Sequence, residues 1–294
     1  MKTCEIHMRD PYVLPWQGRY ILLGTTDDNC WSGKAQGFRA YTSADLENWT
    51  PAGWLFRRTP DFWGEENFWA PELHVYKGGF FLLASFKAPN RRRATCILRA
   101  DDPLGPFTPW GDVQLTPRDW ECLDGTLFVD DRQRPWLVFC HEWLQTGDGE
   151  MCAVALRDDL TGPAGDPILL FRASEAPWAV ETGDGPRGFV TDGPFLYRSR
   201  RGGLWMLWSS QGRDGYAIGV AQSGGGLTGP WRQEREPFFG RDGGHGMIFR
   251  TLDGRLMLSI HAPNQTPNER PLFLPIEESG NAFRRIDENG AALF

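Results

Sequence analysis

Basic charge is scarce in this chain. Its 294 residues include 31 Lys and Arg against 38 Asp and Glu, which gives a formal net charge of −7. A nucleic-acid partner requires a basic face, so we expect none. The one basic run is Arg91-Arg92-Arg93, which we interpret as a solvated hairpin tip. No stretch approaches the roughly 18 consecutive apolar residues of a membrane span, so we expect no membrane partner either.

Cysteine spacing typical of metal or redox sites is also missing. The six cysteines form no CxxC pair, and several lie inside apolar runs, as Cys140 does in Trp-Leu-Val-Phe-Cys. This usage is typical of small buried hydrophobic residues in a reducing compartment. The first ten residues contain no apolar segment of a secretion signal. Together these features predict a cytoplasmic location.

Sustained helical periodicity is absent from almost the whole chain, while large flat side chains and turn formers are abundant. There are 14 Trp, 19 Phe, 35 Gly and 22 Pro. Five segments repeat one pattern: a small or polar residue, Pro or Gly, a short apolar strand, a turn such as Gln17-Gly18, and a second apolar strand. These segments begin at Asp10, Ala70, Asp124, Asp192 and His245.

The spacing of these segments defines the fold class. They recur at roughly 60 residues, and each unit holds a second repeat that supplies a third strand and the lead into a fourth, as in 41–49 and 99–107. Four strands in each of five units predict an all-β, five-bladed β-propeller that occupies residues 1–294 as a single domain. A two-sheet sandwich is the alternative, and it would group its strands irregularly.

The first residue of each unit is expected near the propeller axis, because the innermost strand of every blade lines the central channel. Those five positions hold Asp10, Ala70, Asp124, Asp192 and His245. Asp is uncommon in strands, and carboxylates gathered at one axis repel one another and lose hydration. Capping of turns explains one such Asp, but not four polar residues in five places. We therefore predict a functional site on the axis.

Facing carboxylates of this kind suit glycoside cleavage. One accepts a proton from water, another donates a proton to the leaving oxygen, and their surroundings separate the two pKa values. Aromatic rings near the inner strands suit the apolar faces of sugars. The candidates for such rings are Trp63, Trp69, Trp120 and Trp143.

These segments also carry a resemblance to a known family. Arg9-Asp10-Pro-Tyr-Val, Trp69-Ala-Pro-Glu-Leu-His74, Leu123-Asp124-Gly-Thr, Asp192-Gly-Pro-Phe-Leu-Tyr197 and Gly244-His245-Gly resemble the blade-start motifs of glycoside hydrolase family 43. The resemblance implies an inverting hydrolase of α-L-arabinofuranosides or β-D-xylosides. It further implies that Asp10 is the general base, that Asp124 tunes and orients the acid, and that His245 lies under the sugar and helps to hold a water-coordinated metal ion, often calcium, in the central channel.

The fourth motif departs from that family, whose proton donor is a Glu before Gly-Pro or Ala-Pro. This chain has Asp192-Gly-Pro, one methylene shorter. Either Asp192 is the acid, or another carboxyl replaces it. Glu175 is the leading rival, and Glu142 and Glu121 are weaker ones.

Further substrate contacts are expected at Arg9, Glu72 and His141, in addition to Trp69, Trp120 and His245. For Glu72, a salt bridge within the channel is as good an interpretation as a contact with the substrate.

The predicted function is therefore an exo-acting hydrolase that releases arabinofuranosyl or xylosyl units from an oligosaccharide, within a pocket walled by segments 50–69 and 172–190. The alternatives are a non-catalytic sugar-binding propeller and a galactofuranoside hydrolase. A fructoside-acting propeller would show Asn-Asp-Pro-Asn-Gly at its first strand, and this chain does not. The sequence makes no prediction of the oligomeric state.

Overall fold

The computed structural model describes residues 1–183 and 185–287, and it forms five four-stranded antiparallel sheets. Blade 1 consists of β1 (Arg9–Trp16), β2 (Arg19–Thr25), β3 (Gly37–Ser43) and β4 (Thr50–Arg57). Blade 2 consists of β5 (Glu66–Tyr76), β6 (Gly79–Ala88), β7 (Arg91–Ala100) and β8 (Thr108–Gln114). Blade 3 consists of β9 (Cys122–Val129), β10 (Pro135–His141), β11 (Glu150–Ala155) and β12 (Ile168–Arg172). Blade 4 consists of β13 (Asp192–Arg198), β14 (Leu204–Gly212), β15 (Gly215–Ser223) and β16 (Trp231–Gln233). Blade 5 consists of β17 (Gly244–Arg250), β18 (Leu256–Ala262), β19 (Arg270–Ser279) and β20 (Ala282–Arg285).

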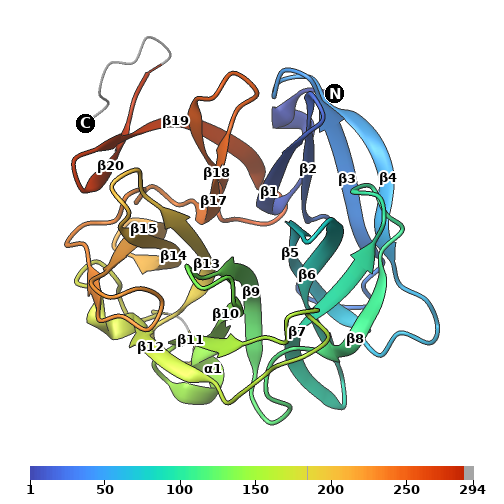
Figure 1. Cartoon of the computed structure of the whole chain (residues 1–294), viewed down its shortest axis with the longest axis horizontal. Coiled ribbons are helices and arrows are strands. Elements are labelled where there is room, and N and C mark those ends of the chain that lie inside the picture. Colours follow the sequence, from blue (N-terminus) through green and yellow to red (C-terminus); the bar gives the residue numbers. More distant parts are fainter. Residues whose placement is uncertain (184, 288–294) are drawn as a thin grey trace.

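The blades surround a common centre, and the first strand of each blade lies innermost (Figure 1). Strands follow one another in chain order within every sheet, as a propeller requires. The predicted five-bladed architecture is confirmed. Helix is confined to short pieces in the described residues: α1 (Trp143–Thr146) and the 3₁₀ turns η1 (Thr3–Glu5) and η2 (Ala173–Glu175). Within the same residues, no helix has the length and apolar character needed to span a membrane.

Hairpin turns form where the sequence places residues that tolerate a positive φ. Gln17 and Gly18 have φ values of 47° and 76°, and they join the paired residues Trp16 and Arg19. Lys77 and Gly78, at 46° and 81°, do the same between β5 and β6. Positive φ at both central residues gives the twist that fits right-handed strands, so these turns fix the register of each inner hairpin.

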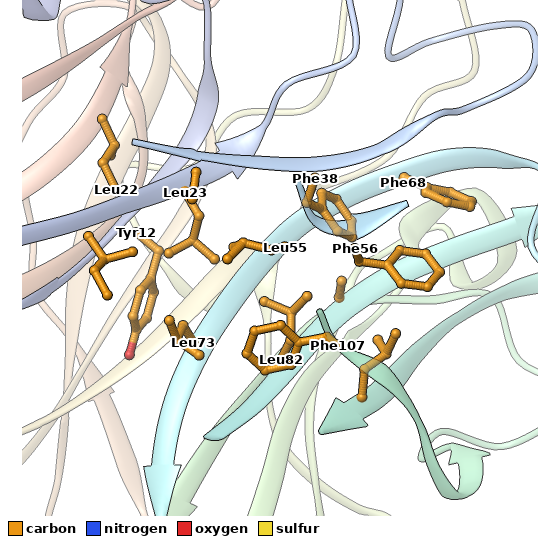
Figure 2. Close-up of a cluster of buried hydrophobic side chains, with 14 of the residues drawn as sticks. Tyr12, Leu22, Leu23, Phe38, Leu55, Phe56, Phe68, Leu73, Leu82 and Phe107 are labelled. Carbon is orange, nitrogen blue, oxygen red and sulfur yellow. The ribbon is translucent and has the colours of Figure 1, made fainter. Parts of the chain in front are cut away.

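The hydrophobic core lies between neighbouring blades. Figure 2 shows part of one such layer, which includes Leu22 and Phe38 of blade 1 and Leu82 and Phe68 of blade 2. All four side chains are buried. Close packing of large rings resists displacement of one blade against the next. The inner strands are therefore held in fixed relative positions, which is what an active site on the axis requires.

A recurring hydrogen bond also joins the blades near the axis. At four junctions between blades, a side chain on the second strand of one blade accepts a hydrogen bond from a backbone N–H on the innermost strand of the next blade. The four bonds are Ala70 N to Thr25 Oγ1 (2.8 Å), Asp124 N to Ser85 Oγ (2.9 Å), His245 N to Ser209 Oγ (2.8 Å) and Asp10 N to His261 Nδ1 (3.1 Å). The last of these closes the ring between blades 5 and 1.

Candidate active site

The inner strand of each blade begins with a bulge whose second residue has a positive φ. The φ values are 53° at Asp10, 46° at Ala70, 55° at Asp124, 50° at Gly193 and 46° at His245. Non-glycine residues seldom adopt this conformation, and it concentrates at functional sites. It turns the backbone so that the side chains of Asp10, Asp124 and His245 gather at the axis.

This geometry corrects one expectation. Asp192 was expected to be equivalent to Asp10, but the equivalent residue is Gly193. Strand pairing agrees, because Asp192 pairs with Ser209 just as Arg9 pairs with Thr25. The sequence comparison aligned Asp192 with Asp10 because both are Asp, and this placed the fourth blade one position out of register. Asp192 therefore enters the site from the position that Arg9 occupies in blade 1.

A cavity of about 380 Å³ opens over these residues. All five blades contribute to its lining. The lining includes Arg9, Asp10, Trp31, Trp69, Arg93, Asp124, Glu142, Trp143, Asp192, Tyr216, His245 and Asn264. Four carboxyl groups named from the sequence, those of Asp10, Asp124, Asp192 and Glu142, thus share one cavity. The prediction missed Trp31, Tyr216 and Asn264. It also placed Arg93 on a solvated hairpin tip, whereas this side chain is buried in the cavity wall.

Asp10 is held as an ionised carboxylate. Thr25 Oγ1 donates to its Oδ2 at 2.6 Å, and His245 Nδ1 lies 3.3 Å from its Oδ1. Burial acts to raise the pKa of Asp10, but the charges of His245 and Arg9 and the Thr25 hydrogen bond outweigh it, so that the pKa lies below its ordinary value. An ionised carboxylate can accept a proton from water.

His261 supports this arrangement from beneath Asp10. Its Nδ1 accepts the Asp10 backbone N–H, so the ring proton resides on Nε2, which donates to Asn264 Oδ1 at 3.0 Å. Burial, with the nearby positive charge of Arg9, lowers the pKa of His261 to about 4. The imidazole is neutral at physiological pH, and this keeps Nδ1 available as an acceptor.

Asp124 and His245 form the middle of the site. His245 Nδ1 lies 3.6 Å from Asp124 Oδ2, and the same oxygen accepts the Gly193 N–H at 3.1 Å. Burial raises the pKa of Asp124, and the negative charges of Asp192 and Asp10 add to the effect. Burial acts to lower the pKa of His245, but Asp10 and Asp124 outweigh it and raise the value. The imidazole is thus biased towards its charged form between two carboxyl groups.

Asp192 has the character of a proton donor. Tyr216 Oη donates to its Oδ2 at 3.0 Å. Burial raises the pKa of Asp192, against opposing contributions from His245 and from the Tyr216 hydrogen bond. The pKa values of Asp124 and Asp192 are both raised and that of Asp10 is lowered, which is the separation that paired acid and base catalysis needs.

Arg9 and two tryptophans form one side of the cavity. Arg9 donates to Glu269 Oε1 at 2.6 Å and to Asn264 Oδ1 at 2.7 Å, and its guanidinium lies 4.7 Å from the centre of the Trp31 ring. Trp31 meets Trp69 edge to face at 5.3 Å and is about half exposed. An exposed, fixed ring at the mouth suits stacking on a sugar. Trp31 lies between strands, where no repeat signal identifies it in the sequence.

Several predicted residues lie outside the cavity lining. Glu175 is exposed on η2, where Oε1 accepts the Arg172 N–H at 2.9 Å, so its candidacy as the acid is not supported by position. His141 and Trp120 stack on each other at 4.1 Å, and His141 binds Glu150 and Gln145. These two rings complete the local packing of blade 3 and do not line the cavity.

The remaining predictions divide in the same way. Glu72 is buried on β5 and bonds to His74 Nε2 at 2.7 Å, which favours the salt-bridge reading. Trp63 lines a groove on the outer side of blades 1 and 2. Segments 50–69 and 172–190 were predicted to form the walls of the pocket. Most of segment 50–69 belongs to β4 or to that groove, and only Trp69 of this segment lines the cavity. Of segment 172–190, only Val190 lines it. Trp143 lines the cavity as predicted.

The described side chains around His245 do not supply a complete set of protein ligands for a metal ion. In residues 1–183 and 185–287, no group of three His, Cys, Asp or Glu side chains is placed to hold a metal ion. His245 turns its Nδ1 towards Asp10 and Asp124, which is the arrangement in which the other ring nitrogen, Nε2, can ligate a metal. A calcium ion coordinated mostly by water needs only this one imidazole from the protein. The predicted calcium ion stays a prediction, and no step is assigned to it.

A propeller with an acid–base pair of carboxyl groups on its axis belongs to the propeller glycoside hydrolases. Comparison with known proteins gives the family: the model described as Glycosyl hydrolases family 43 matches residues 3–277. The chain belongs to glycoside hydrolase family 43.

Individual relatives extend this result. The chain is similar, at 27% identity over 97% of its length and 87% of the relative's, to an extracellular exo-α-(1→5)-L-arabinofuranosidase of Cellvibrio japonicus. It is 44% identical to the solved structure of an endo-arabinase from Bacteroides thetaiotaomicron, with a TM-score of 0.88, covering 95% of this chain and 98% of that one. An α-L-arabinofuranosidase structure from Lactobacillus brevis, 19% identical with a TM-score of 0.71 over 100% and 97% of the two chains, shares the fold.

Proposed function

We propose that this hydrolase cleaves α-L-arabinofuranosyl bonds in α-1,5-linked arabinan or its oligosaccharides, with inversion at the anomeric carbon. The observation that carries the proposal is the pair formed by Asp10 and Asp192. Both line one cavity, and their pKa values are displaced in opposite directions.

In the proposed reaction, a water molecule attacks the anomeric carbon while the bond to the glycosidic oxygen breaks. Asp10 accepts the proton of that water, and Asp192 gives its proton to the departing oxygen. Tyr216 fixes the Asp192 carboxyl through the bond to Oδ2. Asp124 ties the Gly193 turn, directly after Asp192, to the centre of the site. Products are two sugars with free hydroxyl groups, and the acid and base return to their starting states by exchange with solvent.

The choice of arabinofuranosyl over xylosyl bonds rests on the relatives. The curated relative that aligns over most of the chain is named for α-(1→5)-L-arabinofuranosidic bonds, and the 44% identical structure is named an endo-arabinase. Release of xylosyl or galactofuranosyl units stays an alternative prediction from the sequence.

Exo action was predicted from the sequence, and it requires a pocket that accepts one chain end. Endo action is the second candidate, favoured by the 44% identity to an endo-arabinase and by the half-exposed Trp31 at the mouth. A cytoplasmic location likewise remains a prediction.

The test is product analysis on linear α-1,5-arabinan and on reduced arabinohexaose, with xylohexaose as the control. Exo action releases arabinose alone from the first minutes, whereas endo action gives a ladder of shorter oligosaccharides. Proton NMR during the first turnovers should show the β-anomer of the newly formed reducing end. Retained sugar binding without any cleavage would instead support the non-catalytic propeller.

A further inference from the structure

A second pair of charged side chains lies in the cavity wall, apart from the three aspartates. Arg93 of β7 and Glu142, which precedes α1, are only 5% and 7% exposed. Their Nη1 and Oε2 atoms are 2.5 Å apart. Both residues line the same cavity as Asp192. The proposed proton transfers use neither of them.

This pair is held rigidly. The Arg93 guanidinium stacks over Trp69 at 4.2 Å, and Trp69 Nε1 donates to the Cys30 carbonyl at 2.6 Å. Asn67 Oδ1 accepts from Arg93 Nη2 at a long 3.3 Å, and the Asn67 amide in turn donates to Cys30. A planar guanidinium fixed against a ring presents its remaining N–H groups only along its edge.

The hydrogen-bonding capacity of the pair is incompletely used. Arg93 Nε has no partner among the described residues but is shielded from solvent, while Nη1 and Nη2, with two N–H groups each, make one hydrogen bond apiece there. Glu142 is bonded through Oε2 only, which leaves Oε1 with no protein partner in the described chain. Burying an ion pair costs hydration that the mutual attraction seldom restores, and unfilled donors add to that cost. Stability therefore does not explain why this pair is in the wall of a cavity.

The chemistry of the open positions identifies the ligand class. A hydroxyl group can donate to the free carboxylate oxygen while it or its neighbour accepts from the guanidinium edge. An anionic ligand is disfavoured, because Glu142 already neutralises Arg93 and the ionised Asp10 lines the same cavity. A neutral vicinal diol meets these requirements.

We propose that Arg93 and Glu142 bind two neighbouring hydroxyl groups of the substrate sugar and thereby determine which sugar is positioned for cleavage. The pair acts through contact with the substrate and takes no part in proton transfer. This inference rests on the proposed function.

The test pairs Glu142→Gln with monodeoxy arabinofuranosides. A site built to hydrogen-bond a hydroxyl rejects the substrate that lacks it, so loss of the contacted hydroxyl should lower kcat/KM of the wild type by about 10²-fold or more. In Glu142→Gln the same deoxygenation should cost less than about 3-fold, because the contact is already impaired. Arg93→Lys, which keeps the charge but loses the planar fork, should show the same reduced penalty and serves if Glu142→Gln fails to fold.

Glu121→Gln is the matched control. Glu121 also contacts Arg93, through the backbone N–H to Oε2 at 2.9 Å, but it lies outside the cavity lining. It should keep the full wild-type penalty for each deoxy substrate. Equal penalties in the wild type, Glu142→Gln and Arg93→Lys at every ring position would overturn the proposal. The proposal would also be overturned if the activity of Glu142→Gln were lost on the oligosaccharide and restored on an activated aryl glycoside, because that result would make Glu142 the proton donor.

The same comparison can be made without turnover. Asp10→Asn binds substrate without cleaving it, so Kd values for arabinotriose and its deoxy analogues can be measured in this variant. The ratio of the Kd values for the deoxy and the complete sugar should be large in Asp10→Asn and close to one in the double variant that also carries Glu142→Gln. Failure of the wild type to cleave any arabinoside would contradict the proposed function. Unchanged discrimination in these Kd values would contradict the hydroxyl-binding role, whatever the activity.

Discussion

The backbone amide of Gly193 donates a hydrogen bond to Oδ2 of Asp124, with an N–O distance of 3.1 Å. At the other four junctions a residue of the preceding blade's second strand accepts this bond. At the junction of blades 3 and 4 the equivalent residue is Cys140, which pairs with Leu123 as Ser209 pairs with Asp192. A thiol is a weak acceptor, and the bond goes to Asp124 instead. The position of Asp192 is thereby tied to that of Asp124.

This junction predicts the effect of Gly193→Ala. A Cβ at Gly193, where φ is 50°, would lie 2.8 Å from the His245 ring. Displacement of about 1 Å at a catalytic site can cost ~10²-fold, so we expect activity to fall by at least about that factor. The matched control is Gly202→Ala, where φ is 84° and nothing lies within 4 Å of the added carbon. It should lose about 1–2 kcal/mol of unfolding free energy and no activity. Equal activity losses in the two variants would show that backbone strain, not the contact with His245, is responsible.

Asp10→Asn should abolish turnover and leave the fold intact. The amide oxygen can still accept from Thr25, but it cannot take a proton from water. Loss of a general base typically costs about 10²–10⁴-fold in kcat, which steady-state assays on arabino-oligosaccharides would measure. Circular dichroism and thermal unfolding supply the control for folding. Near-normal activity of this variant would remove Asp10 from the mechanism.

The stability of the protein should decline in acid through His261. The pKa of this buried ring is about 4 in the folded state, below its ordinary value of about 6.5. Because the folded state holds the neutral form, the stabilisation is complete above about pH 6.5 and is lost as pH falls towards 4. The total amounts to about 3 kcal/mol.

His261→Ser isolates this contribution, since Ser209 makes the equivalent bond in blade 4. Urea unfolding at intervals from pH 7 to pH 4 should show a steeper decline in the wild type than in the variant. Parallel curves would mean that other groups, and not His261, cause the acid sensitivity.

The two displaced pKa values also predict the pH dependence of catalysis. The lowered pKa of Asp10 places the acidic limb of kcat/KM below the ordinary Asp value of about 3.9, and the raised pKa of Asp192 places the alkaline limb above it. On an activated aryl glycoside, Asp192→Asn should lose the alkaline limb and keep the acidic one. Persistence of both limbs in that variant would assign the alkaline limb to another group.

The repeat in the sequence was sufficient to predict the blades, because hairpins and strands leave local signals in turn residues and apolar runs. The same repeat located Asp10, Asp124 and His245. It placed Asp192 one residue out of register, because the residue with the positive φ in this blade is Gly193. Glycine adopts that conformation without a polar side chain, so nothing in the sequence marked the position as equivalent to Asp10.

Other site residues had no local signal. Tyr216 reaches Asp192 from the third strand of its blade, and Arg93 reaches Glu142 across a blade boundary. The first partnership depends on how the strands of one sheet lie side by side and the second on how two sheets pack, and a one-dimensional pattern records neither. Glu175 shows the converse: a carboxyl close to the fourth blade in sequence is exposed in the structure and lies outside the cavity lining.

The identity of the proton donor is the central claim, and leaving-group dependence tests it most directly. The measurement compares kcat/KM of Asp192→Asn and Glu175→Gln on an α-1,5-arabino-oligosaccharide and on an activated aryl arabinofuranoside, whose leaving group needs little protonation. Asp192→Asn should lose about 10²-fold or more on the oligosaccharide and far less on the aryl substrate, while Glu175→Gln stays close to the wild type on both. A loss in Asp192→Asn of equal size on the two substrates, or the selective pattern appearing in Glu175→Gln, would contradict the assignment of Asp192 as the acid.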